Sequence, residues 1–190
     1  MVEEEISMAI FRRVKMVWLF VIVFVTFTLG CATLEDRDAR YGSNPPVITA
    51  AFAKDRIVSG DTWKIYVNAS DVDGDMDRFV CSTLQDGRHP YPFDLVNIKP
   101  EQRKKLSGYL YLPTYTSHQD LWGIHIELSL YIVDKAGHKS NEKSFELRFA
   151  SKASDKEVDR TLFDERPLGP IMINIMNLDI GLPNTPEQNN

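Results

Sequence analysis

Cysteine is scarce in this chain: only Cys31 and Cys81 occur among its 190 residues. Two cysteines allow at most one intrachain disulfide, and neither lies in the spacing of a zinc site. The sequence also lacks a glycine-rich phosphate loop and a G-x-S-x-G nucleophile elbow. These absences lead us to predict that the protein is not an enzyme. Its isolated histidines, which form no short H-x-x-x-H pair, are His89, His118, His125 and His138.

An excess of basic residues is also missing. The chain carries 22 lysines and arginines against 27 aspartates and glutamates, a net charge of −5. Surfaces that bind nucleic acid are positively charged, because they must neutralise phosphates. The charge balance therefore argues against a nucleic-acid partner.

One long apolar run is present, over residues 16–30, and Arg12, Arg13 and Lys15 precede it. A basic flank, an apolar stretch and a small residue at its end are typical of a secretory signal. Fifteen residues fall short of the ~20 that a helix needs to cross a bilayer. Because three glutamates precede this region, we take Met8 as the true start of the signal.

The apolar run ends in T-L-G-C, which resembles the lipoprotein box of exported bacterial proteins. The resemblance implies that Cys31 is the lipid-attachment residue. The signal peptide would be cleaved just before Cys31, and Cys31 would be acylated. Thr28 and Leu29 depart from the usual aliphatic and small residues of that box. The alternative is an uncleaved anchor helix with an ordinary cysteine. Ala32 after the cysteine implies, by the same resemblance, the outer rather than the inner membrane of the cell envelope.

The mature part begins with a polar stretch, residues 32–44, which we predict to be a flexible tether. Apolar and polar residues then alternate with the period of two that is typical of half-buried strands. Gly and Pro turns separate these strands. Cys81 lies in one of them, and with Cys31 acylated we expect it to be a buried free cysteine. The clearest alternating segments are 47–52, 63–67, 77–84, 107–112, 124–132 and 145–149.

This pattern predicts an all-β protein, a seven-stranded sandwich over residues 45–150. Residues 67–75 (VNASDVDGD) and 131–140 (YIVDKAGHKS) resemble segments of bacterial immunoglobulin-like domains of the PKD and cadherin-like kind. His138 replaces the asparagine common in the second motif. The resemblance implies an immunoglobulin-like fold, preceded by the signal or anchor helix, and says little about activity.

Four carboxylates stand on alternate positions around Gly74: Asp71, Asp73, Asp75 and Asp77. Hard oxygen ligands at this density suit Ca²⁺, although the spacing is not that of an EF-hand. Alternate residues of a strand share a face, so some of these carboxylates could converge on one ion. The other interpretation is a solvated acidic turn, in which Asp and Gly supply the turn conformations. We expect no other cofactor.

The C-terminal part departs from the strand pattern. Residues 151–166 are charged and predict a linker or short helix, and residues 183–190 predict a disordered end. Between them, residues 167–182 form an apolar, strand-like tail in which Ile171, Ile173 and Ile175 alternate with other residues. Such a tail either folds back as an extra edge strand or is lent to a partner protein by β-augmentation.

These features together predict a non-enzymatic lipoprotein, anchored to the membrane through Cys31. Its sandwich would serve as an interaction or structural module with a protein partner in a bacterial envelope assembly. The alternative is a glycan- or small-ligand-binding module, because aromatic side chains on an open sheet face can stack on sugars. The aromatic residues that favour this alternative are Tyr109, Tyr111, Tyr115 and Trp122.

Overall fold

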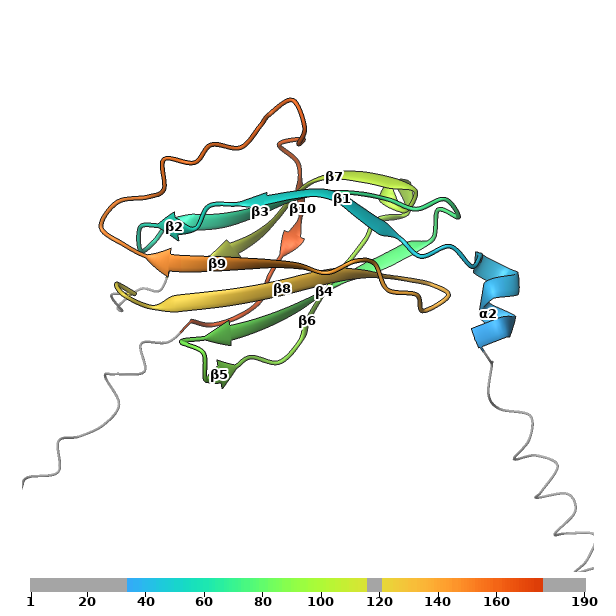
Figure 1. Ribbon diagram of the computed structural model, residues 1–190, viewed down its shortest axis with the longest axis horizontal. Helices are drawn as coiled ribbons and strands as arrows, with labels where there is room; N and C mark the ends of the chain where they lie inside the picture. Colours follow the sequence, from blue (N-terminus) through green and yellow to red (C-terminus); the bar gives the residue numbers. More distant parts are fainter. Residues whose placement is uncertain (1–33, 116–120, 176–190) are drawn as a thin grey trace, which may run out of the picture.

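The computed structural model describes residues 34–115 and 121–175, which fold as two β-sheets packed face to face (Figure 1). Predictions about the signal region, Cys31, His118 and residues 176–190 lie outside the described residues. The elements in chain order are α2 (Leu34–Tyr41), β1 (Val47–Ala53), β2 (Arg56–Ile57), β3 (Thr62–Ser70), β4 (Met76–Gln85), β5 (His89–Pro90), β6 (Asp94–Asn97), the 3-10 turn η1 (Pro100–Gln102), β7 (Lys105–Pro113), β8 (His125–Asp134), β9 (Lys143–Phe149) and β10 (Pro167–Pro170).

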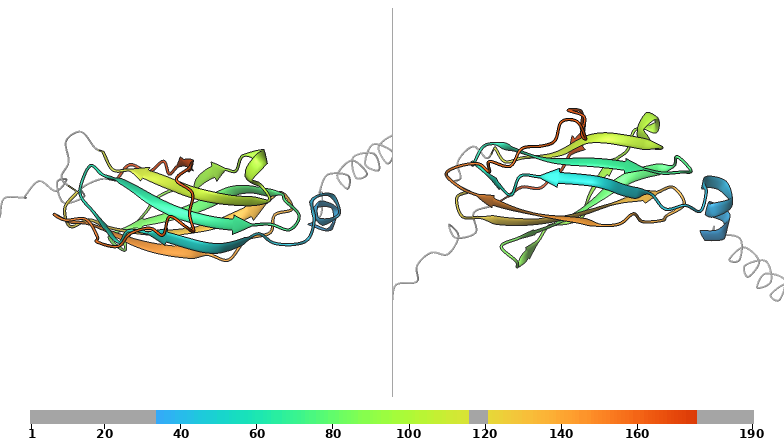
Figure 2. Two further views of the ribbon diagram at one scale, coloured as in Figure 1. Left: turned by 90° about the horizontal axis from the view of Figure 1, so that it is seen from above. Right: turned by 45° about the horizontal axis from the view of Figure 1, so that its top comes forward.

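The strand order is β1-β3-β7-β10 in the first sheet and β2-β9-β8-β4-β5 in the second, where β6 also pairs with β4. Strands β3 and β7, and likewise β4 and β8, are neighbours without being consecutive in the chain. The chain therefore crosses repeatedly between the sheets, as in an immunoglobulin-like sandwich. Figure 2 shows the two layers from further directions. The predicted all-β, immunoglobulin-like fold is thus confirmed.

Ten strands are described, against the seven that we predicted. The six long strands, β1, β3, β4, β7, β8 and β9, coincide with the alternating segments of the sequence, whereas β2, β5, β6 and β10 have only two to four residues each. Two residues cannot display an alternating pattern, and four provide only the minimum that defines one.

The core lies between the sheets, where alternate residues of the long strands meet. Trp63, Ile65 and Val67 of β3 are fully buried, and the alternating row of β8 faces them from the second sheet. Trp63 also donates its indole N–H to the carbonyl of Lys54 at 2.7 Å, so the buried polar atom is satisfied. Each buried side chain of this size contributes roughly 1.5–3 kcal/mol of transfer free energy. The predicted inward faces of both strands are therefore confirmed.

The segment 34–41, which we predicted to be part of a flexible tether, is the helix α2 instead. It lies at one end of the sandwich, on the right in Figure 1. A polar helix of eight residues is marginal on its own, so contacts with the domain must hold it. Within the described residues, no helix is long and apolar enough to cross a membrane.

The C-terminal segment folds back onto its own domain. Strand β10 pairs in parallel with β7, and the backbone N–H of Ile171 continues the pairing by donating to the carbonyl of Tyr111. Ile171 and Ile175 are buried in the core and Ile173 packs against it. The docking role proposed for Ile171 and Ile175 is therefore wrong, because the side chains that a partner would need are already covered. The alternative that the tail forms an extra edge strand is the correct one over 167–170.

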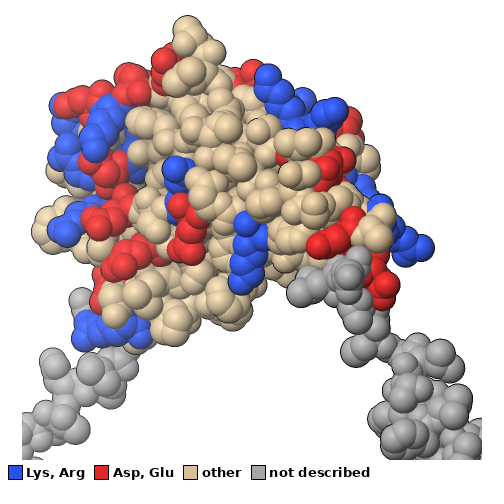
Figure 3. Space-filling model, turned by 45° about the vertical axis from the view of Figure 1, so that its right-hand side comes forward, with Lys and Arg blue, Asp and Glu red and all other residues tan. Residues whose placement is uncertain are grey.

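Residues 151–166 contain no helix and cross the outer face of the first sheet. Phe163 is buried there against Tyr66, with ring centroids 5.8 Å apart. Glu165 accepts a hydrogen bond from the Tyr66 hydroxyl at 2.7 Å and pairs with Lys64 at 2.9 Å. This strap gives the outer face of the sheet a small aromatic core of its own. Figure 3 shows one face of the molecule, on which acidic and basic side chains are interspersed and lie most densely toward one side.

Candidate metal centre

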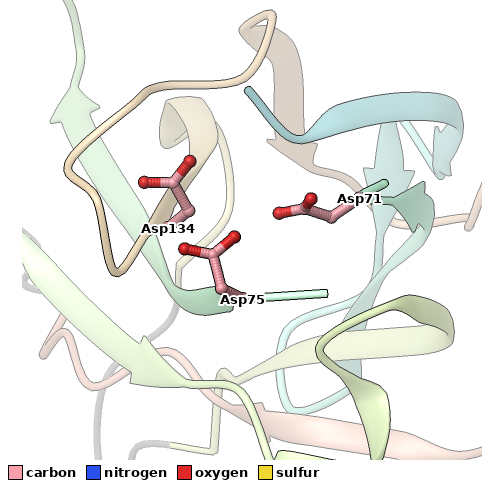
Figure 4. A group of neighbouring side chains, drawn as sticks. All are labelled: Asp71, Asp75 and Asp134. Carbon is pink, nitrogen blue, oxygen red and sulfur yellow. The ribbon is translucent and has the colours of Figure 1, made fainter. Parts of the chain in front are cut away.

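Three aspartates meet at the end of the sandwich where α2 lies. Asp71 follows β3, Asp75 precedes β4, and Asp134 is the last residue of β8. All three are at least nine-tenths buried, with exposed fractions of 3%, 7% and 2%. One carboxylate oxygen of each lies within 4.8 Å of those of the other two. Figure 4 shows the three side chains pointing toward one another from their separate strands.

Local backbone turns fix two of the three carboxylates. Oδ1 of Asp71 accepts hydrogen bonds from the N–H groups of Asp73 and Gly74, at 2.8 and 3.2 Å. Oδ1 of Asp134 accepts from the N–H groups of Gly137 and His138, at 2.6 and 2.7 Å. Aspartate side chains that bind the backbone two to four residues on are typical of tight turns. In both Asp71 and Asp134, the turn therefore engages Oδ1 and leaves Oδ2 available for other contacts.

Two oxygens in the cluster have no hydrogen-bond partner. These are Oδ2 of Asp71 and Oδ1 of Asp75, both fully shielded from solvent. The other oxygen of Asp75 accepts from the N–H of Lys135 at 3.2 Å. Burying a carboxylate oxygen without a partner is costly, because the hydration that it had in the unfolded chain is not replaced. A cation between the carboxylates would supply the missing interactions.

The electrostatics of the cluster favour either a proton or a metal ion. Burial, together with the neighbouring charges of Asp134 and Asp71, raises the pKa of Asp75 to about 6. Carboxylates this close cannot all be ionised in a dry site without a compensating charge. Hard divalent cations such as Ca²⁺ take six to eight oxygen ligands, and this donor set consists entirely of oxygen. The residues present therefore fit Ca²⁺ by the chemistry of the donors.

The structure brings together two of the four aspartates that the sequence suggested. Asp71 and Asp75 belong to the cluster, whereas the side chains of Asp73 and Asp77 are engaged elsewhere. Asp73 accepts hydrogen bonds from the backbone and side chain of Asn44, at 2.8 to 3.1 Å. Asp77 pairs with Arg78 at 3.2 Å. The alternation of the four residues predicted a shared face, but only Asp77 of the four lies within a strand.

Sequence reasoning missed Asp134, which completes the cluster. It lies within the segment 131–140, and its side chain accepts hydrogen bonds from the backbone of the turn that follows β8. The pairing of β4 with β8 places Asp134 opposite Met76, next to Asp75. The sequence could have indicated Asp134 only as an aspartate at the end of a strand. Recognising that it lies beside Asp75 requires knowing that β8 pairs with β4.

Helix α2 is attached to the same loops. The His138 ring contacts Asp134 through Nδ1 at 3.0 Å and Asp38 of α2 through Nε2 at 3.3 Å. Gly42 follows the helix with a φ of +107°, and a Cβ at this position would collide with the side chain of Asp73. The end of α2 and the carboxylate cluster are therefore one connected unit.

Comparison with known proteins found no matching family model and no matching curated protein. Two solved structures are similar. One is the PKD domain of an M14-like peptidase from a Thermoplasmatales archaeon, with 14% identity over 57% of this chain and all of that one, at a TM-score of 0.35. The other is a CARDB domain from Pyrococcus furiosus, solved in complex with di-metal ions, with 11% identity over 57% of this chain and 96% of that one, at a TM-score of 0.33.

The other residues singled out from the sequence lie apart from the cluster. His125 is near Glu127 and Glu146 on the sheet surface, and His89 is exposed in β5. Tyr109 and Tyr111 are half-buried neighbours on the outer face, with ring centroids 6.3 Å apart, and Lys64 lies over the Tyr109 ring. The most exposed aromatic side chains are Tyr115 and Trp122, at 78% and 70% exposure.

Cys81 is buried and free, as predicted. Burial raises the pKa of its thiol to about 12, with a smaller contribution from Asp94. Because the thiolate is the reactive form, this cysteine is inert at neutral pH.

Proposed function

We propose that this chain is a non-catalytic envelope lipoprotein, anchored through Cys31, whose immunoglobulin-like domain is a structural or interaction module. A Ca²⁺ ion at Asp71, Asp75 and Asp134 fixes the domain to the helix that joins it to the anchor. The observation that carries this proposal is the buried carboxylate cluster, with two unpartnered oxygens, in the loops that hold α2. The helix begins three residues after Cys31.

The metal ion has a structural role in this proposal. It would cross-link three turns that belong to different strands and remove the repulsion between their carboxylates. Nothing in this arrangement requires a reaction, and the single free thiol of the described residues is inert at neutral pH. The ion would therefore act by setting the orientation of the domain relative to the membrane.

Thermal unfolding of the full chain in detergent tests the metal site. At a Ca²⁺ concentration one hundred times Kd, ligation adds about 2.7 kcal/mol of stability, which corresponds to roughly 5 to 10 °C in Tm. The variant Asp134→Asn should lose this shift. Asp77→Asn is the matched control, because Asp77 is a neighbouring acidic residue outside the cluster, and it should keep the shift. A Tm that responds to neither Ca²⁺ nor chelator would remove the metal site.

Intact-mass measurement on protein purified from its own membranes tests the anchor. Acylation predicts a chain that begins at Cys31 and carries the mass of two or three acyl groups, and Cys31→Ser should leave the chain unprocessed. An unmodified Cys31 on the full-length chain would instead identify an uncleaved anchor.

The far end of the domain favours a glycan-binding surface as the second candidate. Tyr115 and Trp122 lie beyond the end of β7 that pairs with Thr62, opposite to the end that carries α2. Exposed aromatic rings can stack on sugar rings. Retention on immobilised envelope glycans should fall for Trp122→Ala but not for Tyr109→Phe, whose ring remains in place.

A further inference from the structure

An open groove of about 710 Å³ separates α2 from the start of β4 and the turn after β8. Four cationic side chains line it, Arg37, Arg40, Arg78 and Lys135, together with the ring of Tyr41. Two carboxylates, those of Asp36 and Asp77, face them. The lining thus carries two positive charges in excess, on a chain whose net charge is −5. Such a local reversal of sign marks this groove as a site for an anion.

Contacts between the helix and the domain assemble these cations into one surface. The Tyr41 ring contacts both Arg40 and Lys135, whose charged groups are 5.9 and 5.5 Å from its centroid. Such cation–π contacts hold both side chains beside the groove. The contact of His138 with Asp38 fixes the helix to the same turn, so Asp38 does not compete for the groove cations.

The acidic residues only partly neutralise the groove. Oδ2 of Asp77 lies 3.2 Å from Nη2 of Arg78. Both side chains are partly exposed, so this ion pair contributes little to stability in water. A phosphate that approaches Arg78 and Lys135 would meet guanidinium and ammonium donors on one side and the two arginines of α2 on the other. Arginine in particular recognises phosphate through paired N–H donors.

The groove is close to the anchor. Only three residue steps separate Cys31 from Leu34, a distance of about 10 Å at most for an extended chain. Arg37 and Arg40 lie within the next two turns of the helix, which rises about 1.5 Å per residue. The surface potential of an anionic leaflet acts over a Debye length of about 8 Å at physiological salt. The groove is therefore within reach of the headgroups beside the anchor.

We propose that this groove binds the phosphate of an anionic lipid headgroup in the leaflet that holds Cys31. Binding there gives the domain a second attachment to the membrane and fixes its tilt. The proposal rests on the anchoring at Cys31 argued above. The groove proposal and the anchoring proposal can fail separately. The groove is tested by titration with soluble lipid, and the anchor is tested by intact-mass measurement.

The test is a titration of the full chain in uncharged detergent, with chelator present, using short-chain phosphatidylglycerol. We expect saturable binding that short-chain phosphatidylcholine does not reproduce. Each basic residue near an anionic surface contributes about 1 kcal/mol, so Arg78→Gln with Lys135→Gln should weaken binding roughly thirty-fold. The control is Arg88→Gln with Lys152→Gln, which removes the same charge from exposed positions outside the groove and should bind as the parent chain does.

Three results would overturn the proposal. Equal binding of the two lipids would show that charge is not recognised, and an equal loss in the control variant would show that only net charge matters. Saturation by inorganic phosphate at the same affinity would identify a soluble anion as the ligand rather than the lipid surface. Unchanged Tm values for both double variants establish that each one is folded.

Discussion

His138 connects Asp38 of helix α2 to the end of the β-sandwich, with 3.3 Å between its Nε2 and Oδ1 of Asp38. The other ring nitrogen contacts Asp134, which belongs to the carboxylate cluster. One side chain therefore links the N-terminal helix to the candidate metal centre. The contacts of this ring lead to the first prediction.

Replacing His138 with alanine should release α2 from the domain. Since the helix is too short to persist alone, the backbone amides of residues 38–42 should exchange at least tenfold faster with solvent. Amide hydrogen exchange followed by mass spectrometry measures this change. His125→Ala is the control, because His125 also lies near two acidic residues but on the surface of the sheet. Faster exchange at α2 in the control would contradict the assigned role of His138.

Stability without metal should fall as the pH rises through the range from about 4 to 6. The pKa of Asp75 is about 6 in the folded protein against 3.8 in the unfolded chain, so the folded state binds the extra proton in this range. The protonated carboxyl of Asp75 contributes on the order of 3 kcal/mol to the free energy of unfolding. This contribution is fully present below pH 4 and is lost above pH 6.

Urea unfolding in chelator at several pH values, with Asp75→Asn compared to the parent chain, isolates this contribution. The variant should lose the downward slope and be the more stable protein at pH 7. Asp77→Asn should retain the slope. If Asp75→Asn and the parent chain give parallel curves, the carboxyl of Asp75 is not the group that titrates.

Cys81 should resist alkylation in the native protein. A thiol with a pKa of about 12 is almost entirely protonated at pH 8, and its burial also excludes the reagent. Mass spectrometry after incubation with iodoacetamide should find Cys81 unmodified until urea unfolds the domain. Rapid labelling of the native protein would mean that the free energy of local opening around β4 is far lower than the free energy of global unfolding.

Ile171 should behave as a core residue. Truncation of a fully buried isoleucine to alanine costs about 2–5 kcal/mol, so Ile171→Ala should lower the unfolding free energy by this amount. Met172→Ala is the matched control, since the adjacent Met172 is 74% exposed and should change stability by less than about 0.5 kcal/mol. Equal effects of the two substitutions in urea unfolding would show that the C-terminal segment does not pack as described.

Sequence reasoning predicted what depends on local periodicity. The inward rows of β3 and β8 could be identified because alternation on a half-buried strand repeats every two residues. Helix α2 could not, because its eight mostly polar residues are too few to repeat an apolar pattern and gain their order from the contacts of Tyr41 and Asp38 with the domain. The structure of this segment is set by tertiary contacts rather than by propensity.

The candidate metal centre likewise combines residues that the sequence reveals with one that only the tertiary structure reveals. Asp71 and Asp75 are close in sequence and could be recognised as an acidic turn, but Asp134 enters through the pairing of β4 with β8. The identity of the third carboxylate of the cluster is thus a property of strand register. For the tail, the alternation of Ile171, Ile173 and Ile175 predicted an extended, strand-like segment, whereas the parallel pairing of β10 with β7 depends on a sheet edge that the sequence does not reveal.

The position of β1 also determines how the domain would resist a pull applied through α2. Tension that passes through α2 enters the sandwich at Val47 and runs along β1, which is paired over its length with β3. Hydrogen bonds in an antiparallel pair lie perpendicular to the strands, so a force along the strand loads them all together. If the chain is anchored through Cys31 as proposed, a pull from the membrane places this strand pair in shear, so its hydrogen bonds must break as a group rather than open one at a time from a strand end.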